Sequence, residues 1–224
     1  IAFTPNVGAN SLNDHDIAVE RVRALAAVND IVIVSFHAGA EGDGAERLPF
    51  GREYYVGEDR GDVVFFARAM VDAGADLLLG HGPHVPRAME LYRDRLIAYS
   101  LGNFATYYGI GVEGNRGIAP ILTARLDAEG RFRGGRIDST IQLRPDGPSI
   151  DPEGRARGDG AALTRATGNA QRSARRLQPA LTTITLSIRF PSMSTTSMRS
   201  PRQVTTSPAL GMRPRRASTK PATV

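Results

Sequence analysis

The residues Asp30-Ile31-Val32-Ile33-Val34-Ser35-Phe36-His37, called the decisive stretch below, indicate the fold class of this chain. Its run of β-branched and other apolar residues is typical of a strand that is covered on both faces. Outward from it, hydrophobic periodicity and capping residues predict strands at 1–4 and 77–79 and helices at 14–28 and 62–73. We expect Phe65 among the inward-facing residues of the second helix. Because strands and helices alternate, the strands should be parallel and joined by helical crossovers.

The pattern changes after about residue 88. Alternating segments at 89–92, 95–100, 117–127 and 132–143 predict successive strands of a β-meander. The segment 38–60 is rich in glycine and charge, and we interpret it as a long loop. The fold class expected is therefore α/β, a layered sandwich of two mixed sheets flanked by helices.

Charge divides the 224 residues into two regions. Residues 1–154 carry a net charge of −7 and residues 155–224 carry +12, which together give the formal net charge of +5. We expect one domain over 1–150, a weak helix or linker over 151–170, and a basic, Ser/Thr/Pro-rich, disordered tail over 171–224, with one isolated strand-like segment at 181–190. The abrupt loss of acidic residues after Asp159 is also what a shifted reading frame would produce.

Composition excludes several classes of function. The chain has no cysteine, which excludes disulfides and thiolate metal sites. No apolar run is long enough to span a membrane. The basic tail has a single aromatic residue, Phe190, to stack on bases, so we expect no nucleic-acid partner. The glycine pattern at 109–114 matches a dinucleotide-binding motif by letter only, because a strand rather than a helix is expected after it.

Three of the four histidines follow predicted core strands. His37 ends the stretch quoted above, and His81 and His84 follow the strand at 77–79. Ligands gather beyond the carboxyl ends of strands in open α/β sheets, so the three imidazoles should lie at one edge. Imidazole suits Zn, Fe, Mn or Ni, which makes a metal site the leading interpretation. The alternative is that the three residues are hydrogen-bonding loop histidines. If they do bind metal, a centre with two ions would also need bridging carboxylates.

Three further polar residues have competing interpretations. Glu41 could orient an imidazole, accept a proton or bind a cation, or be a solvated loop carboxylate. Asn103 could contact a ligand or simply form a turn. His15 stands at a predicted helix start without partners, and we expect it at the surface.

With these motifs the chain resembles the bacterial capsule-synthesis CapA family of poly-γ-glutamate synthesis. The resemblance covers 1 to about 150 and is carried by His37-Ala38-Gly39-Ala40-Glu41, by Asp72–Val85 with Gly80-His81-Gly82-Pro83-His84, by Glu90-Leu91-Tyr92, and by Ile97–Phe104. The family often has an aromatic residue where Ala38 stands and a histidine where Gly82 stands. Ile1 corresponds to a point midway through the family's domain, so we expect only the C-terminal portion here.

The resemblance implies a calcineurin-like metallophosphatase-related fold. It also implies that His37, His81 and His84 bind divalent metal (Mn, Fe or Zn), with Glu41 as the catalytic acidic residue, and Asn103 is the candidate substrate-binding residue. The expected chemistry is metal-assisted hydrolysis or transfer in capsule or exopolymer synthesis, at the cell envelope, with an anionic polymer or the synthesis machinery as partner. The alternatives are a non-catalytic module that binds the polymer or its synthase, and an inactive truncated fragment.

Overall fold

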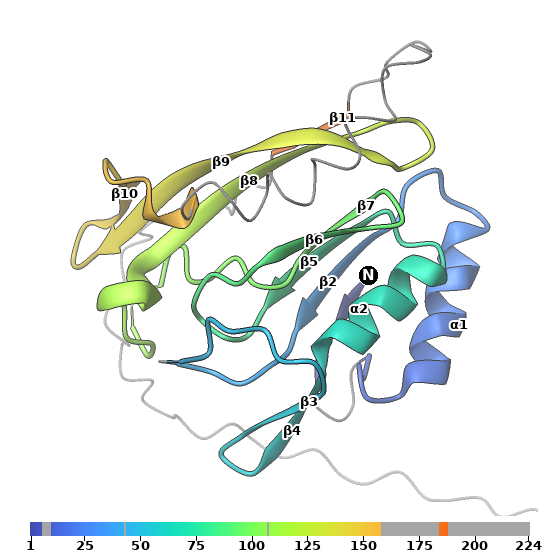
Figure 1. Ribbon diagram of the computed structural model, residues 1–224, viewed down its shortest axis with the longest axis horizontal. Coiled ribbons are helices and arrows are strands. Elements are labelled where there is room, and N and C mark those ends of the chain that lie inside the picture. Colours follow the sequence, from blue (N-terminus) through green and yellow to red (C-terminus); the bar gives the residue numbers. More distant parts are fainter. Residues whose placement is uncertain (6–9, 43, 107, 158–183, 188–224) are drawn as a thin grey trace, which may run out of the picture. The chain divides into compact units, whose positions relative to one another are not determined.

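The computed structural model describes residues 1–5, 10–42, 44–106, 108–157 and 184–187, all of which belong to one unit, Ile1–Arg189 (Figure 1). These residues form a mixed α/β structure with two helices and two larger sheets. None of the helices among them is long and apolar enough to cross a membrane.

The first sheet has five strands in the order β1-β2-β5-β7-β6. Four of them are parallel, and the fifth, β6, forms an antiparallel hairpin with β7. The strands are β1 (Ala2–Phe3), β2 (Ile33–His37), β5 (Leu77–His81), β6 (Met89–Tyr92) and β7 (Arg95–Ala98). The parallel sheet with helical crossovers is therefore confirmed, and the decisive stretch forms its second strand.

The two helices are α1 (His15–Ala26) and α2 (Val63–Asp72). Asp62 caps α2, since its carboxylate accepts a hydrogen bond of 2.9 Å from the Phe65 amide. The inward orientation expected for Phe65 is wrong: the residue is 57% exposed, and its neighbour Phe66 is fully buried instead. The buried residues of α2 form one stripe along the helix, and Phe65 lies outside it; they are Val63, Val64, Phe66, Ala67, Met70 and Val71.

The second sheet has four strands in the order β10-β9-β8-β11. All its pairings are antiparallel, so the expectation of two mixed sheets is wrong for this one. Its strands are β8 (Ile118–Leu126), β9 (Phe132–Leu143), β10 (Gly147–Ile150) and β11 (Ile184–Ser187). The expected meander is thus divided, because β6 and β7 join the first sheet while β8 and β9 form the second.

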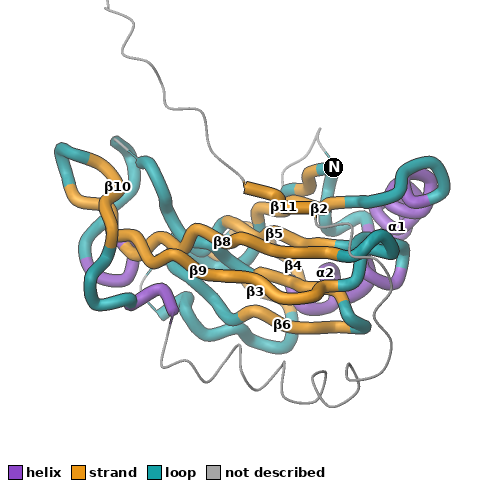
Figure 2. The backbone as a smooth tube through the Cα atoms, turned by 90° about the horizontal axis from the view of Figure 1, so that it is seen from above, coloured by secondary structure: helices purple, strands orange, loops and turns teal. Residues whose placement is uncertain are grey.

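Three layers result from these elements (Figures 1 and 2). The helices cover one face of the five-stranded sheet, and the antiparallel sheet covers the other. Side chains alternate along β2 and β5, so Val34 and Leu78 join the core under the helices while Leu77 and Leu79 join the core between the sheets. Burial on both faces explains the continuous apolar run of the decisive stretch.

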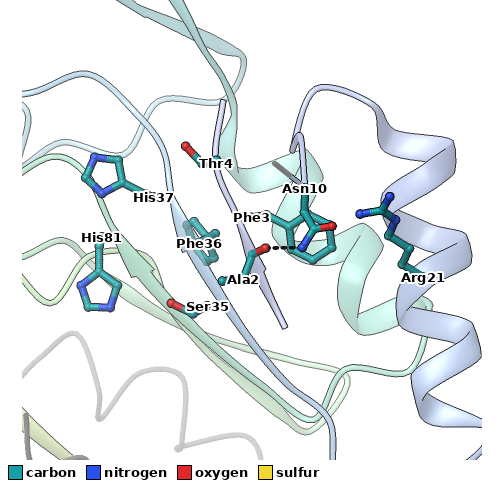
Figure 3. A pocket seen from close by; sticks show the side chains of 9 residues that line it. All are labelled: Ala2, Phe3, Thr4, Asn10, Arg21, Ser35, Phe36, His37 and His81. Atoms are coloured by element: carbon teal, nitrogen blue, oxygen red, sulfur yellow. Dashed lines mark hydrogen bonds between the residues drawn. The ribbon is translucent and has the colours of Figure 1, made fainter. Parts of the chain in front are cut away.

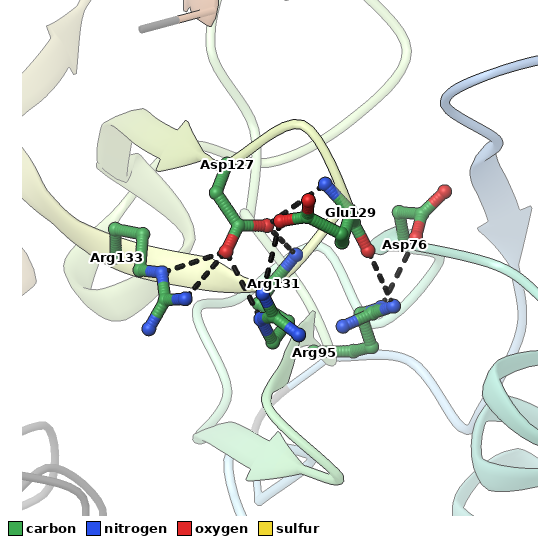
Figure 4. Close-up of polar contacts among 6 residues, drawn as sticks. All are labelled: Asp76, Arg95, Asp127, Glu129, Arg131 and Arg133. Carbon is green, nitrogen blue, oxygen red and sulfur yellow. Dashed lines mark hydrogen bonds and ion pairs between the residues drawn. The ribbon is translucent and has the colours of Figure 1, made fainter. Parts of the chain in front are cut away.

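A polar network at the amino ends of the first-sheet strands holds this arrangement (Figure 4). Asp76 accepts hydrogen bonds from the Val32 amide at 2.9 Å and from the Arg95 Nε at 3.0 Å. Arg95 also donates to the Glu129 carbonyl in the β8–β9 turn at 2.7 Å. A Cβ atom at Gly130 would lie 1.8 Å from the Asp76 carboxylate, so only glycine fits there. The network joins three strands to the second sheet at the end opposite the histidines.

The segment expected to be one loop, 38–60, contains a hairpin, which is a correction. Its strands are β3 (Arg52–Tyr55) and β4 (Glu58–Asp62), with Val56 and Gly57 in left-handed conformation at the turn. The glycine pattern at 109–114 leads through a 3-10 turn (Gly114–Gly117) into β8, so no helix N-terminus faces it.

Of the expected linker and tail, the structure describes 151–157 and 184–187. The first contains a 3-10 turn (Arg155–Arg157). The second is β11, which lies within the expected strand 181–190 but pairs with β8, so it is neither isolated nor disordered. The remaining part of 158–224, including the disorder and the shifted frame predicted there, lies outside the described residues.

Candidate metal centre

His37 and His81 occupy the last positions of the neighbouring strands β2 and β5. They are direct partners in the parallel register. Strand alternation puts both on the face that carries Leu77 and Leu79. The Ala38 amide donates to the His81 carbonyl at 2.8 Å, which extends the pairing into the loop that carries Glu41. The sheet edge expected from the sequence is the one at which these side chains lie.

Three side chains come together at this edge: His37, Glu41 and His84. One ligand atom from each lies within 4.8 Å of the others. The imidazole rings of His37 and His84 have centroids 5.8 Å apart. His81 stands next to His37 but does not belong to this group. The structure therefore gathers two of the three expected histidines with the expected carboxylate.

His84 reaches the group through an unusual backbone conformation. Its φ is +60°, in the left-handed region that residues other than glycine seldom adopt. Gly82, two residues before, has φ +125°, and a Cβ atom there would lie 2.5 Å from the Ala38 carbonyl oxygen. Ala38 and Gly82, for which the resemblance led us to expect an aromatic residue and a histidine, therefore lie close together.

Asn103 fixes the orientation and the protonation of the His84 ring. Its Nδ2 donates to the carbonyls of His84 and Arg116, each at 3.1 Å, which leaves Oδ1 facing the His84 Nδ1 at 2.8 Å. An amide oxygen only accepts, so Nδ1 must carry the proton. The lone pair of neutral His84 is then on Nε2, which lies 3.7 Å from Glu41 Oε2. Asn103 is 5% exposed, and its side-chain oxygen and nitrogen bond to the ring and the backbone of His84.

Glu41 lies between a histidine and an arginine. Its Oε1 is 2.7 Å from Nη2 of Arg60, while its Oε2 faces His84. Arg60 comes from β4, in the segment that the sequence predicted to be a loop, and its side chain is 8% exposed. Glu41 is thus no solvated loop carboxylate: it is a paired side chain, 21% exposed, in the group.

A buried ion pair supports the loop that carries Glu41. Arg87 donates to both carboxylate oxygens of Glu53, at 2.9 and 2.7 Å, and its Nε donates to the Ala45 carbonyl at 2.5 Å. Glu53 also accepts from the Ala40 amide at 3.0 Å. Arg87 follows the His84 segment, so the pair ties the two ligand-bearing loops together. No sequence motif predicted that Arg60, Glu53 or Arg87 would belong to the site, because their partners are distant along the chain.

Burial favours the neutral form of the His37 and His81 imidazoles. Desolvation lowers the pKa of His37, and the nearby Arg60 and His84 lower it further, against a smaller raising effect of Glu41. Desolvation also lowers the pKa of His81, with His37 and His84 adding to the effect. A neutral imidazole is the form that binds a metal, so the environment favours ligation.

Two cavities flank the group. One, of about 640 Å³, lies beside β1 and extends from His37 and His81 toward Arg21 of α1 (Figure 3). The other, of about 600 Å³, is lined by Glu41, Arg47, Tyr54 and the Glu53–Arg87 pair, among others. Side chains of the group therefore line spaces that a small molecule could enter.

His15 does not stand alone at the surface, which corrects the sequence expectation. Its ring packs edge-on against Phe65 with centroids 4.8 Å apart, and it is half-buried. It lies in α1, outside the group of His37, Glu41 and His84.

The sequence of this part of the chain matches a known family. Residues 3–108 match the model described as bacterial capsule synthesis protein PGA_cap, and this range contains every residue of the group. This part of the chain belongs to the bacterial capsule synthesis family. The resemblance to CapA proteins inferred from the motifs is thereby confirmed.

Similar proteins include the capsule biosynthesis protein CapA of Bacillus anthracis, 41% identical over 75 residues, or 34% of this chain. The PGA biosynthesis protein CapA of Bacillus subtilis is 38% identical over 91 residues, or 41% of this chain. A probable polyglutamine synthesis accessory protein of Mycobacterium tuberculosis is 38% identical over 97 residues, or 43%. The matches span only 15%, 20% and 22% of the lengths of these three relatives.

Proposed function

We propose that this chain carries the metal-binding segment of a hydrolase or transferase of capsule or polyglutamate synthesis. The observation that carries the proposal is the group formed by His37, Glu41 and His84, whose ligand atoms lie within 4.8 Å of one another. All three belong to the segment that matches the capsule synthesis family.

The donor set fits a divalent ion. Bonds from imidazole nitrogen or carboxylate oxygen to a metal such as zinc measure about 2.0–2.2 Å, so two ligands across an ion are at most about 4.4 Å apart. Ligand atoms within 4.8 Å would therefore need only a small shift to close around one ion. Two imidazoles and a carboxylate suit Mn, Fe or Zn, and Asn103 holds one imidazole as a hydrogen-bonded outer partner should.

The bound ion would supply Lewis acidity and lower the pKa of a coordinated water. The residues of this chain would hold the ion and accept the proton. His37 and His84 would hold the ion as neutral imidazoles, and Glu41 would either complete the coordination or accept a proton from a water nearby. Asn103 acts through His84, so we assign it a positioning role in place of the substrate contact considered from the sequence. His81 stands close enough to His37 to act as a further ligand in a larger centre.

The names of the relatives support the capsule assignment. Two of those described above are named for capsule or PGA biosynthesis and one for polyglutamine synthesis. We propose that the polymer made in this process, an anionic chain, is the partner of the site, and that the protein acts at the cell envelope. We also propose that the layers of helices and two sheets correspond to a metallophosphatase-like fold, with the metal at the strand ends as in open α/β sheets.

The test is metal content after dialysis against Mn²⁺, Fe²⁺ and Zn²⁺ in turn, measured by mass spectrometry on the full chain. We expect one of these metals to be retained by the wild type and lost by a His37→Ala, His84→Ala double variant. A His15→Gln variant is the matched control, since that histidine lies outside the group. A separate His81→Ala variant shows whether the third imidazole contributes.

Equal metal content in the wild type and the double variant would refute the site. Retention of metal without hydrolysis of phosphate esters or γ-glutamyl peptides would favour the non-catalytic binding module over the enzyme.

A further inference from the structure

Arg60 is buried beside the metal group with part of its guanidinium unsatisfied. The residue is 6% exposed. Its Nε and Nη2 atoms have no hydrogen-bond partner among the described residues, and Nη1 reaches only the exposed Glu58, at 3.5 Å. Nη2 is 2.7 Å from Glu41 Oε1, but the two groups are not aligned as a hydrogen bond. Buried polar groups normally have hydrogen-bond partners, so we expect an acceptor to bind these guanidinium donors.

The guanidinium is directed at the metal group. Its nearest carboxylate is Glu41, a member of the group, at 2.7 Å. The Tyr55 ring, centred 5.9 Å from the guanidinium carbon, covers it on one side. Arg60 therefore belongs to the wall of the same site, although it is not a metal ligand.

The charges of this site are unbalanced once a divalent ion is present. Glu41 supplies one negative charge, Arg60 one positive charge, and the ion two more. Glu58 offers little compensation because its side chain is 66% exposed. A buried excess of positive charge is stabilised by an anion that hydrogen-bonds to it.

From this geometry we propose that Arg60 binds an oxyanion of the substrate, a phosphoryl or carboxylate group, next to the metal group. The inference deepens the proposed function and rests on it for the role of the metal. A guanidinium presents a planar fork of donors that matches the oxygens of either group, which a lysine would not. The substrate class is thus anionic at the position that Arg60 faces.

Calorimetric titrations of the full chain with inorganic phosphate and with glutarate test the proposal, each without metal and with Mn²⁺. We expect Arg60→Met to weaken binding of the preferred probe about ten-fold or more, because a charge-assisted contact is lost. Arg52→Met is the matched control, as this arginine lies on the same hairpin and pairs with Asp59 at the surface. The preferred probe distinguishes a phosphoryl from a carboxylate substrate. Circular dichroism confirms folding, and Arg60→Gln replaces Arg60→Met if the latter does not fold.

Equal affinity of both probes for the wild type and the Arg60 variant, or no binding of either, would overturn the proposal. The outcomes separate the two proposals made for this site. If the wild type retains no metal but its affinity for a probe depends on Arg60, the oxyanion site stands and the metal site fails. If metal is retained and probe affinity is independent of Arg60, the metal site stands and the oxyanion site fails.

Discussion

Asn103 and His84 form a hydrogen bond of 2.8 Å between Oδ1 and Nδ1, and the amide of Asn103 is held in place by two backbone carbonyls. This one relationship decides which nitrogen of His84 is available to a metal. It also connects the loop after β5 to the loop after β7, two segments that no motif in the sequence links.

Replacing Asn103 should therefore weaken metal binding without removing a ligand. We expect Asn103→Ala to lower metal affinity about 10–100-fold, the usual effect of losing a hydrogen-bonded partner of a ligand. Titration with Mn²⁺ or Zn²⁺ measures it. Asn115→Ala is the matched control, because the side-chain amide of that asparagine donates to Glu46 at the surface. Unchanged affinity in Asn103→Ala would show that His84 needs no such support.

The buried pair of Arg87 and Glu53 should contribute strongly to stability when only one partner is changed. Their side chains are 1% and 5% exposed. We expect Glu53→Gln to lower the free energy of unfolding by about 3–5 kcal/mol, because the Arg87 charge is left uncompensated. Urea denaturation measures the change.

Two further variants make this test specific. Asp138→Asn removes one partner of the more exposed Arg136–Asp138 pair and should cost about 1 kcal/mol or less. Replacing both buried partners, with Arg87→Met and Glu53→Leu, should recover much of the stability. A Glu53→Gln variant as stable as the wild type would contradict the role assigned to the pair.

Acidification should destabilise the fold because the unfolded chain protonates its histidines more readily than the folded chain does. The pKa values of His37 and His81 lie below the ordinary value of 6.5, mainly because burial disfavours the charged ring. The unfolded chain therefore binds more protons below this pH, and the free energy of unfolding should decrease as the pH falls from about 6.5 toward the folded-state pKa values.

Denaturant unfolding between pH 8 and pH 5 measures this slope, and NMR titration of the ring protons assigns it to individual histidines. The His81→Gln variant should show a shallower pH dependence than the wild type. Stability that is constant, or that increases on acidification through this range, would be inconsistent with neutral imidazoles at the sheet edge.

Gly82 should tolerate no side chain, for two separate reasons. Its φ of +125° disfavours other residues, and a Cβ would lie 2.5 Å from the Ala38 carbonyl oxygen. We expect Gly82→Ala to cost about 2–5 kcal/mol, the sum of backbone strain and overpacking. Gly57→Ala isolates the first effect, because Gly57 has φ +81° with no atom within 4 Å of the added Cβ. That variant should cost about 1–2 kcal/mol. Equal losses in the two would show that contact with Ala38 is unimportant.

Local patterns predicted the elements best where a single rule applied. The decisive stretch is a strand because its residues are buried alternately in two cores, and Asp62 begins α2 by capping the Phe65 amide. Phe65 was misplaced because hydrophobicity alone does not say which of two adjacent phenylalanines faces the core. The hairpin of β3 and β4 was missed since most of its side chains are polar or exposed.

The candidate site was predictable only in part. Strand ends followed by histidines indicated the sheet edge, because parallel strands bring their carboxyl ends together. That Glu41, rather than His81, joins His37 and His84 depends on how two loops fold back. Arg60, Glu53 and Arg87 carry no signal in the sequence at all, since an arginine or a glutamate is ordinarily a surface residue.

Residue patterns along the chain were enough to predict the parallel sheet, its helices, the edge at which the histidines lie and the match of residues 3–108 to the capsule synthesis family. Three features depend on how the layers pack: which side chains meet at this edge, which nitrogen of His84 faces the group, and which arginine is buried beside it. The reason is physical: periodicity and capping act between residues close along the chain. The contacts that build the site join loops of different strands, and their burial is set by the packing of all three layers.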